Sequence, residues 1–185
     1  MLPMALLVAI WLSASRAWRG AVAWVVLFAI GSALVVCTKV AYLGWGVGFR
    51  PLDFTGISGH AMTATATLSV AGYFAGDRYS RFAAIAAGSF GCLLGVAIAI
   101  SRVIIGVHSP SEVVVGCALG CAIALASIRV IHTYRRVVAS PVVFVIALVA
   151  LVVTLHGERA PSEHLITRLA LYLSGHSAPF ARYIN

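Results

Sequence analysis

Apolar residues recur along this chain in runs long enough to cross the hydrocarbon core of a bilayer, which takes about 20 residues in a helix. Short connectors rich in arginine, glycine, serine or proline separate the runs. This pattern predicts an all-α integral membrane bundle of about six transmembrane helices. The predicted helices span residues 2–15, 20–38, 59–76, 82–100, 110–128 and 137–155.

The two ends of the chain are expected to differ from this central pattern. The first apolar run resembles a signal peptide, but Arg16 and Arg19 follow it, whereas a signal peptide carries its positive charges in front. We therefore interpret this run as a short first helix and residues 1–155 as one transmembrane domain. Residues 156–185 are too polar to span a membrane, and we expect Pro161 to open a short helix that lies at the interface or caps the bundle.

The composition also indicates a membrane protein. Hydrophobic residues make up 62% of the chain and charged residues 10%, and the mean hydropathy of +1.03 exceeds what a soluble domain of 185 residues could bury. The 13 lysines and arginines are too dispersed for a nucleic-acid-binding face, so we interpret them as topology signals and phosphate ligands. The four cysteines lie in apolar stretches and share no ligand spacing with the histidines, which favours free thiols over a metal site.

The charges of the connectors predict an orientation. Connectors on one side carry seven cations and one anion, net +6, whereas those on the other side, with the tail, carry six cations and four anions, net +2. The positive-inside rule then places the first side in the cytoplasm and both chain termini outside.

Two pairs of glycines predict close helix packing. Gly91 and Gly95 are four residues apart in the fourth predicted helix, and Gly116 and Gly120 are four apart in the fifth. Small residues at this spacing let transmembrane backbones approach each other, so we expect these two helices to contact one another within one protomer. A homodimer formed through the same faces is the alternative.

Ionisable residues are costly at membrane depth, so the places where they gather are informative. Here they gather after the second predicted helix, at the start of the third, and between the fourth and fifth. The three groups contain Lys39 and Arg50; Ser58, Gly59 and His60; and Arg102, His108 and Glu112. Because successive helices cross the membrane in opposite directions, all three groups are expected at the same face. His132 belongs to the opposite face, and we assign it no role.

Together these residue types suit phosphate chemistry. The cations can bind phosphate oxygens, and Ser58 and Gly59 stand at a helix start, where free backbone N–H groups favour an anion. Two histidines in a cationic pocket suit a nucleophile and a general acid, since imidazole titrates close to neutral pH. Glu112, one helical turn after His108, can accept the proton of one ring nitrogen and hold the attacking tautomer. The set describes phosphoryl transfer without a metal or a cofactor.

The order of these motifs along the chain resembles that of a known family. Lysine and Arg-Pro, then Ser-Gly-His, then Ser-Arg followed by a histidine and an acid four residues later are typical of the type 2 phosphatidic acid phosphatase superfamily, which also includes vanadium haloperoxidases. The resemblance implies that His108 attacks phosphorus to form a phosphohistidine, that His60 protonates the leaving oxygen and later activates water, and that Glu112 orients His108. The phosphate ligands that it implies are Lys39, Arg50, Ser58, Gly59 and Arg102.

The chain departs from the family pattern in three places. Glu112 stands where the family usually has aspartate, and Ile57 where it usually has proline. Lys39 and Arg50 are eleven residues apart, whereas the family usually has seven. Because several glycines lie between these two cations, we expect an unwound turn that brings Arg50 back toward the site.

These observations predict a lipid phosphate phosphatase whose partners are its lipid substrate and the surrounding membrane lipids. We expect it in a bacterial cytoplasmic membrane with its site facing the periplasm or exterior. The resemblance implies undecaprenyl diphosphate, phosphatidylglycerol phosphate, phosphatidic acid or a lipid A phosphate as substrate, and an outward site favours the first. A lipid-to-lipid phosphotransferase and a non-catalytic lipid-binding or transport protein are the alternatives; a haloperoxidase is disfavoured because that activity belongs to soluble members.

Overall fold

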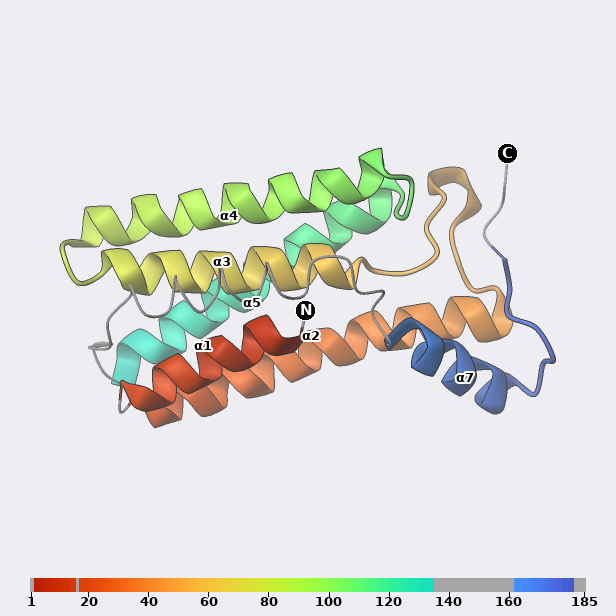
Figure 1. Cartoon of the computed structure of the whole chain (residues 1–185), viewed down its shortest axis with the longest axis horizontal. Helices are drawn as coiled ribbons and strands as arrows, with labels where there is room; N and C mark the ends of the chain where they lie inside the picture. The colour runs from red at the N-terminus through yellow and green to blue at the C-terminus, as the bar shows by residue number, and fades with distance from the viewer. Residues whose placement is uncertain (1, 16, 135–161, 182–185) are drawn as a thin grey trace.

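The computed structural model describes residues 2–15, 17–134 and 162–181, and the regular structure within these ranges is helical (Figure 1). The elements in chain order are α1 (Leu2–Ala14), α2 (Trp18–Trp45), the 3-10 helix η1 (Arg50–Leu52), α3 (Gly59–Gly76), α4 (Arg81–Ile104), α5 (Pro110–Tyr134) and α7 (Ser162–Ser174). The all-α fold class is confirmed. The sixth predicted span, residues 137–155, lies outside the described residues.

Three helices, α2, α4 and α5, are long and apolar enough to cross a membrane. The chain is therefore a membrane protein. The first apolar run forms α1, which has only 13 residues, as expected for a short first helix. The 18-residue helix α3 carries Thr63, Thr65 and Thr67, which are buried against neighbouring helices instead of facing lipid.

The second helix is longer than the sequence predicts. α2 continues to Trp45, beyond the predicted end at residue 38. Gly44 lies in this extension and lets α7 pack closely against α2, since the carbonyl oxygen of Ala170 is 3.2 Å from where a Gly44 Cβ would lie. The helix ends only at Gly46, whose φ of 69° is the left-handed conformation that closes many helices.

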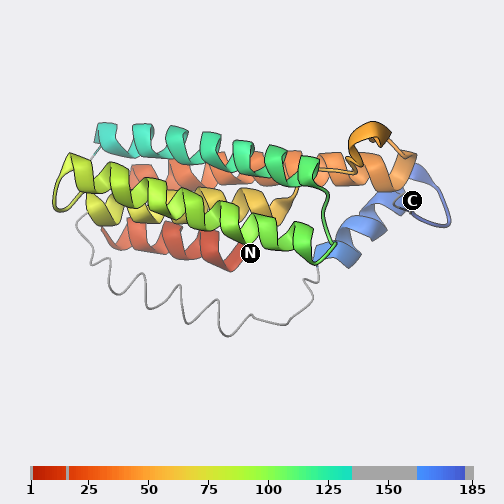
Figure 2. The same cartoon turned by 90° about the horizontal axis from the view of Figure 1, so that it is seen from above.

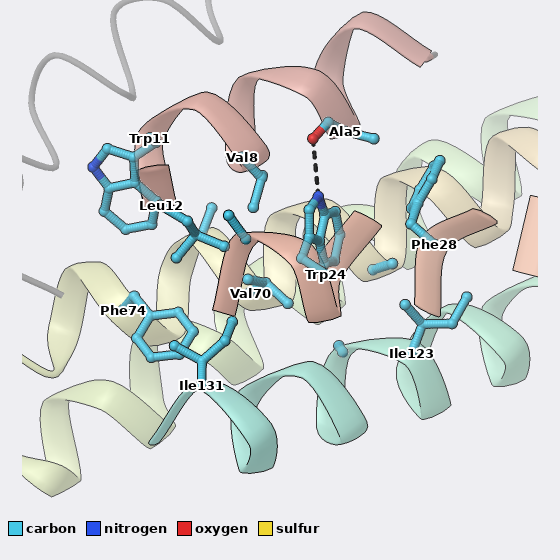
Figure 3. Close-up of a cluster of buried hydrophobic side chains, with 14 of the residues drawn as sticks. Ala5, Val8, Trp11, Leu12, Trp24, Phe28, Val70, Phe74, Ile123 and Ile131 are labelled. Atoms are coloured by element: carbon cyan, nitrogen blue, oxygen red, sulfur yellow. Dashed lines mark hydrogen bonds between the residues drawn. The ribbon is translucent and has the colours of Figure 1, made fainter. Parts of the chain in front are cut away.

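The hydrophobic core joins α1, α2, α3 and α5 (Figure 3). Trp24 of α2 is fully buried at its centre, and its indole Nε1–H donates to the carbonyl oxygen of Ala5 at 2.9 Å. This bond ties the short α1 to the bundle and satisfies the polar atom of a buried tryptophan. The labelled side chains around Trp24 are Val8, Trp11, Leu12, Phe28, Val70, Phe74, Ile123 and Ile131.

The glycine pairs do not pack as predicted. A Cβ on Gly95 of α4 would lie 2.6 Å from the Cα of Thr65, and a Cβ on Gly120 of α5 would lie 2.6 Å from the carbonyl oxygen of Met62. Both glycine faces therefore lie against α3, which runs alongside α4 and α5 in both views (Figure 1 and Figure 2). The prediction that α4 and α5 use these faces to contact each other was wrong, because the spacing identifies a close-packing face but not its partner.

The tail contains the expected short helix, α7, which packs beside the C-terminal half of α2 (Figure 1). Ala170 is buried on the side of α7 that contacts α2, whereas Leu165 and Tyr172 are exposed, as suits a helix at a membrane interface. After α7 the chain returns to the end of α2, where the Tyr42 hydroxyl donates to the carbonyl oxygen of Ala181 at 2.9 Å. The tail is therefore fixed to the end of the bundle at which α2 terminates.

Replacing Gly95 with alanine is expected to force α3 and α4 apart, because the added Cβ would lie 2.6 and 2.8 Å from the Thr65 Cα and backbone N. Overpacking of this kind costs about 1–3 kcal/mol, so the Tm of the detergent-solubilised protein should fall by several degrees. The control is Ala86→Val, which adds bulk at an exposed position of the same helix and should leave the Tm unchanged. Equal losses in the two variants would contradict close packing at Gly95.

Candidate active site

The three polar groups singled out in the sequence lie toward the same end of the bundle. The C-terminal end of α2, the start of α3 and the connection from α4 to α5 all lie at this end (Figure 1). His60 is the second residue of α3, and the charges of Arg102, Lys39 and the His108 imidazole act electrostatically on its ring. His60 thus interacts electrostatically with His108 and with two of the three predicted phosphate-binding cations, Arg102 and Lys39.

The connection between α4 and α5 is a tight turn closed on Arg102. The carbonyl oxygen of Arg102 accepts hydrogen bonds from the backbone N–H of Val107 at 3.1 Å and of His108 at 3.3 Å. Gly106 permits this reversal with a φ of 72°. The spacing of six residues between Arg102 and His108 therefore places the histidine directly over the last turn of α4.

His108 is held by Glu112. The His108 Nδ1 lies 2.7 Å from Glu112 Oε2, and the two side chains are only 10% and 2% exposed. A carboxylate can only accept, so Nδ1 carries the proton and donates it to Glu112, which leaves a lone pair on Nε2. This is the tautomer that a nucleophilic imidazole requires.

The same carboxylate caps α5. Ser109, Pro110, Ser111 and Glu112 have the Ser-x-x-Glu order of a capping box, with proline at the first helical position. The Ser109 hydroxyl accepts from the Glu112 N–H at 3.4 Å, and Glu112 Oε2 accepts from the Ser109 N–H at 3.3 Å. This capping signal is readable in the sequence, although its role in fixing Glu112 was not predicted.

Thr55, in the loop between α2 and α3, completes the surroundings of Glu112. Glu112 Oε1 accepts hydrogen bonds from the Thr55 N–H at 2.9 Å and from the Thr55 hydroxyl. The carbonyl oxygen of Glu112 also accepts from the Ser58 N–H at 3.2 Å. Thr55 belongs to none of the three polar groups, and no local motif identifies it, because its partner lies 57 residues away.

Ser58 and Gly59 begin α3. The Ser58 hydroxyl accepts from the Ala61 N–H at 3.3 Å and so acts as the N-cap of the helix. Ser58 is fully buried, whereas Gly59 and His60 are half-buried at the helix start. The structure gives Ser58 a capping function, and its contact with a phosphate stays a prediction.

The cations of the site differ in their surroundings. Arg102 is half-buried, and among the described residues its Nε has no hydrogen-bond partner. A buried N–H group without a partner is uncommon, and it fits a guanidinium whose acceptor is a ligand. Lys39 lies in α2 with its stem against the loop, since a Cβ on Gly56 would lie 3.0 Å from Lys39 Cγ.

Arg50 stands in the loop that follows α2. The expected break in the helix between Lys39 and Arg50 occurs at Gly46, and the chain then reverses through a bridge between Phe49 and Phe54. Arg50 itself is the exposed first residue of η1. Its approach to the histidines stays a prediction.

Comparison with known proteins identifies the family. The model of the PAP2 superfamily matches residues 45–136, a range that contains every candidate site residue except Lys39. A Klebsiella pneumoniae protein described as an uncharacterized 22.5 kDa protein in cps region is 31% identical over 173 residues, which cover 90% of this chain and 79% of the relative. The chain belongs to the PAP2 superfamily. No solved structure matches it. Because PAP2 proteins are in general phosphatases, this membership indicates a phosphatase-type activity.

Two departures from the usual PAP2 pattern have structural counterparts. Ile57 stands where proline is usual, and its N–H donates to the Thr38 hydroxyl at 3.1 Å, a bond that proline cannot make. Glu112 stands where aspartate is usual, and its carboxylate contacts both His108 and Thr55. In each case a hydrogen bond joins the loop between α2 and α3 to a helix, to α2 from Ile57 and to α5 from Thr55.

Replacing Thr55 with valine should destabilise the protein, because it removes the hydroxyl that donates to Glu112 while keeping the branched shape and the backbone bond. Hydrogen bonds to charged groups contribute about 1.5–3 kcal/mol, and we expect a loss of that order in the free energy of unfolding measured in detergent. Thr55→Ser keeps the hydroxyl and should retain most of the stability. A loss in Thr55→Ser with none in Thr55→Val would attribute the effect to the methyl group instead of the hydrogen bond.

Proposed function

We propose that this protein removes a phosphate group from a membrane lipid through a phosphohistidine formed on His108. The 2.7 Å contact between His108 Nδ1 and the buried Glu112 carboxylate carries the proposal. It fixes the ring and leaves Nε2 free to attack phosphorus. Membership of the PAP2 superfamily supports the same class of reaction.

The reaction proceeds in two steps, the transfer of the phosphoryl group to His108 and the hydrolysis of the phosphohistidine. In the first, the bond between His108 Nε2 and phosphorus forms as the bond between phosphorus and the lipid oxygen breaks, and His60 gives its proton to that leaving oxygen. In the second, His60 takes a proton from water, the water oxygen attacks phosphorus, and the nitrogen–phosphorus bond breaks to release inorganic phosphate. Glu112 retains the Nδ1 proton of His108 throughout.

Fixed positive charge stabilises the transferring phosphoryl group. The Arg102 guanidinium has a buried Nε without a partner among the described residues, and the charges of Arg102 and Lys39 both act on His60. Both cations stabilise charge on the phosphoryl oxygens without a metal or a cofactor. Arg50, Ser58 and Gly59 complete the proposed phosphate site.

The position of the site favours a lipid substrate. It lies at one end of a membrane-spanning bundle, where a lipid phosphate at the headgroup level can reach it without leaving the bilayer. The charge of the connectors supports an outer location on a bacterial cytoplasmic membrane. We propose undecaprenyl diphosphate as the substrate, with attack at its terminal phosphorus and the lipid monophosphate as leaving group.

The purified protein should release phosphate from undecaprenyl diphosphate in excess EDTA, faster than from phosphatidic acid or phosphatidylglycerol phosphate. His108→Ala removes the nucleophile and should lower the rate by about 10³-fold or more. Phosphate release is measured in detergent with each lipid in turn. A rate that survives the substitution would exclude His108 as the nucleophile, and a faster rate with another lipid would correct the proposed substrate.

Shortening Glu112 to aspartate should lower kcat although aspartate is the usual PAP2 residue. The carboxylate would be one methylene too short to contact both His108 and Thr55, and a displacement of about 1 Å near the reacting group costs up to about 10²-fold. KM should change little, because Glu112 is proposed to contact the histidine and not the phosphate. A variant as active as the parent would show that Thr55 and Glu112 do not set the position of His108.

A further inference from the structure

A polar cavity lies at the end of the bundle opposite His60 and His108. It has a volume of about 520 Å³ and lies where α3 connects to α4, beside the last turn of α5. From His60 to Tyr73, the first lining residue on α3, the helix rises by about 20 Å. The cavity is therefore separate from the candidate active site, and its volume falls in the range of small-molecule pockets.

The lining of this cavity is positively charged. Arg78 and Arg81 both line it and are exposed, and neither forms an ion pair within the part of the chain that the structure describes. The one carboxylate in the lining, Asp77, lies 3.7 Å from His132 Nε2, which also lies 2.9 Å from the Tyr73 hydroxyl oxygen. Because the Asp77 carboxylate lies beside His132, the guanidinium groups of Arg78 and Arg81 remain available to an anion.

Two exposed aromatic residues, Tyr79 and Phe82, flank the arginines in the sequence. Tyr79 lines the cavity, Phe82 follows Arg81 at the start of α4, and each is 82% exposed. Aromatic rings at the ends of transmembrane helices are typical of the membrane interface, where lipid phosphates lie. The two arginines are therefore placed at the level of the headgroups on the opposite membrane face.

We propose that this cavity binds the phosphate group of an anionic phospholipid, held by Arg78 and Arg81. Two planar guanidinium groups can bind phosphate oxygens with paired N–H groups, whereas the adjoining rings contact the upper part of the acyl chains. This binding site is independent of the proposed phosphatase reaction. Free inorganic phosphate presents the same chemistry, and the experiment separates the two sources.

The test measures binding of phosphatidylglycerol to the full-length protein in a neutral detergent by native mass spectrometry. Phosphatidylglycerol has a phosphodiester and therefore no terminal phosphate for the proposed reaction to remove. The double variant Arg78→Gln/Arg81→Gln should bind it about tenfold or more weakly. Arg129→Gln removes an exposed arginine of α5 outside the cavity lining and should bind like the parent. Phosphatidylcholine, which is zwitterionic, should bind weakly to all three proteins.

Displacement of the lipid by millimolar inorganic phosphate would show that the phosphate group alone is recognised, and its failure would show that the lipid chains contribute. An equal loss in Arg129→Gln would reduce the effect to diffuse surface charge and overturn the proposal. A fourth protein, Arg102→Gln, tests the other end of the bundle, and a loss of binding only in this variant would place the lipid there and also overturn the proposal. The absence of binding to the parent protein would overturn it as well.

Discussion

The arrangement of the candidate site depends on the burial of one carboxylate. Glu112 is 1% exposed, and a buried charge is tolerated only when it is fully hydrogen-bonded. Its donors come from His108, the Ser109 backbone and Thr55, so two separate loops must meet at the start of α5. The hydrogen bonds to the Glu112 carboxylate fix the His108 tautomer. The same bonds hold the two loops together at this end of the bundle.

The central helix brings the second histidine to the same place. Gly95 of α4 and Gly120 of α5 allow both helices to approach the backbone of α3. Since the Ser58 N–H also donates to the Glu112 carbonyl oxygen, the start of α3 is fixed relative to the start of α5. The close packing of α4 and α5 on α3 and the hydrogen bond between the starts of α3 and α5 thus act together. They bring His60 close enough to His108 for the two rings to interact electrostatically.

Much of this arrangement could be predicted from the sequence, because it depends on local patterns. Hydropathy predicts the helices, and the four-residue spacing of His108 and Glu112 predicts their contact. The contact of Thr55 with Glu112 and the partner of the Gly95 face could not be predicted, because both depend on segments far apart in the chain. The true end of α2 was also missed, because Gly44 and Gly46 both follow the predicted end and the sequence does not show which of them closes the helix.

The most direct test of the account is to trap the covalent intermediate. The protein is mixed with a lipid labelled in its terminal phosphate, quenched within milliseconds in alkali, digested, and examined by mass spectrometry. The account predicts an acid-labile, alkali-stable phosphoryl group on the peptide that contains His108, attached through Nε2 because Glu112 holds Nδ1. Phosphorylation of His60 instead, or rapid turnover with no covalent label on either histidine, would contradict it.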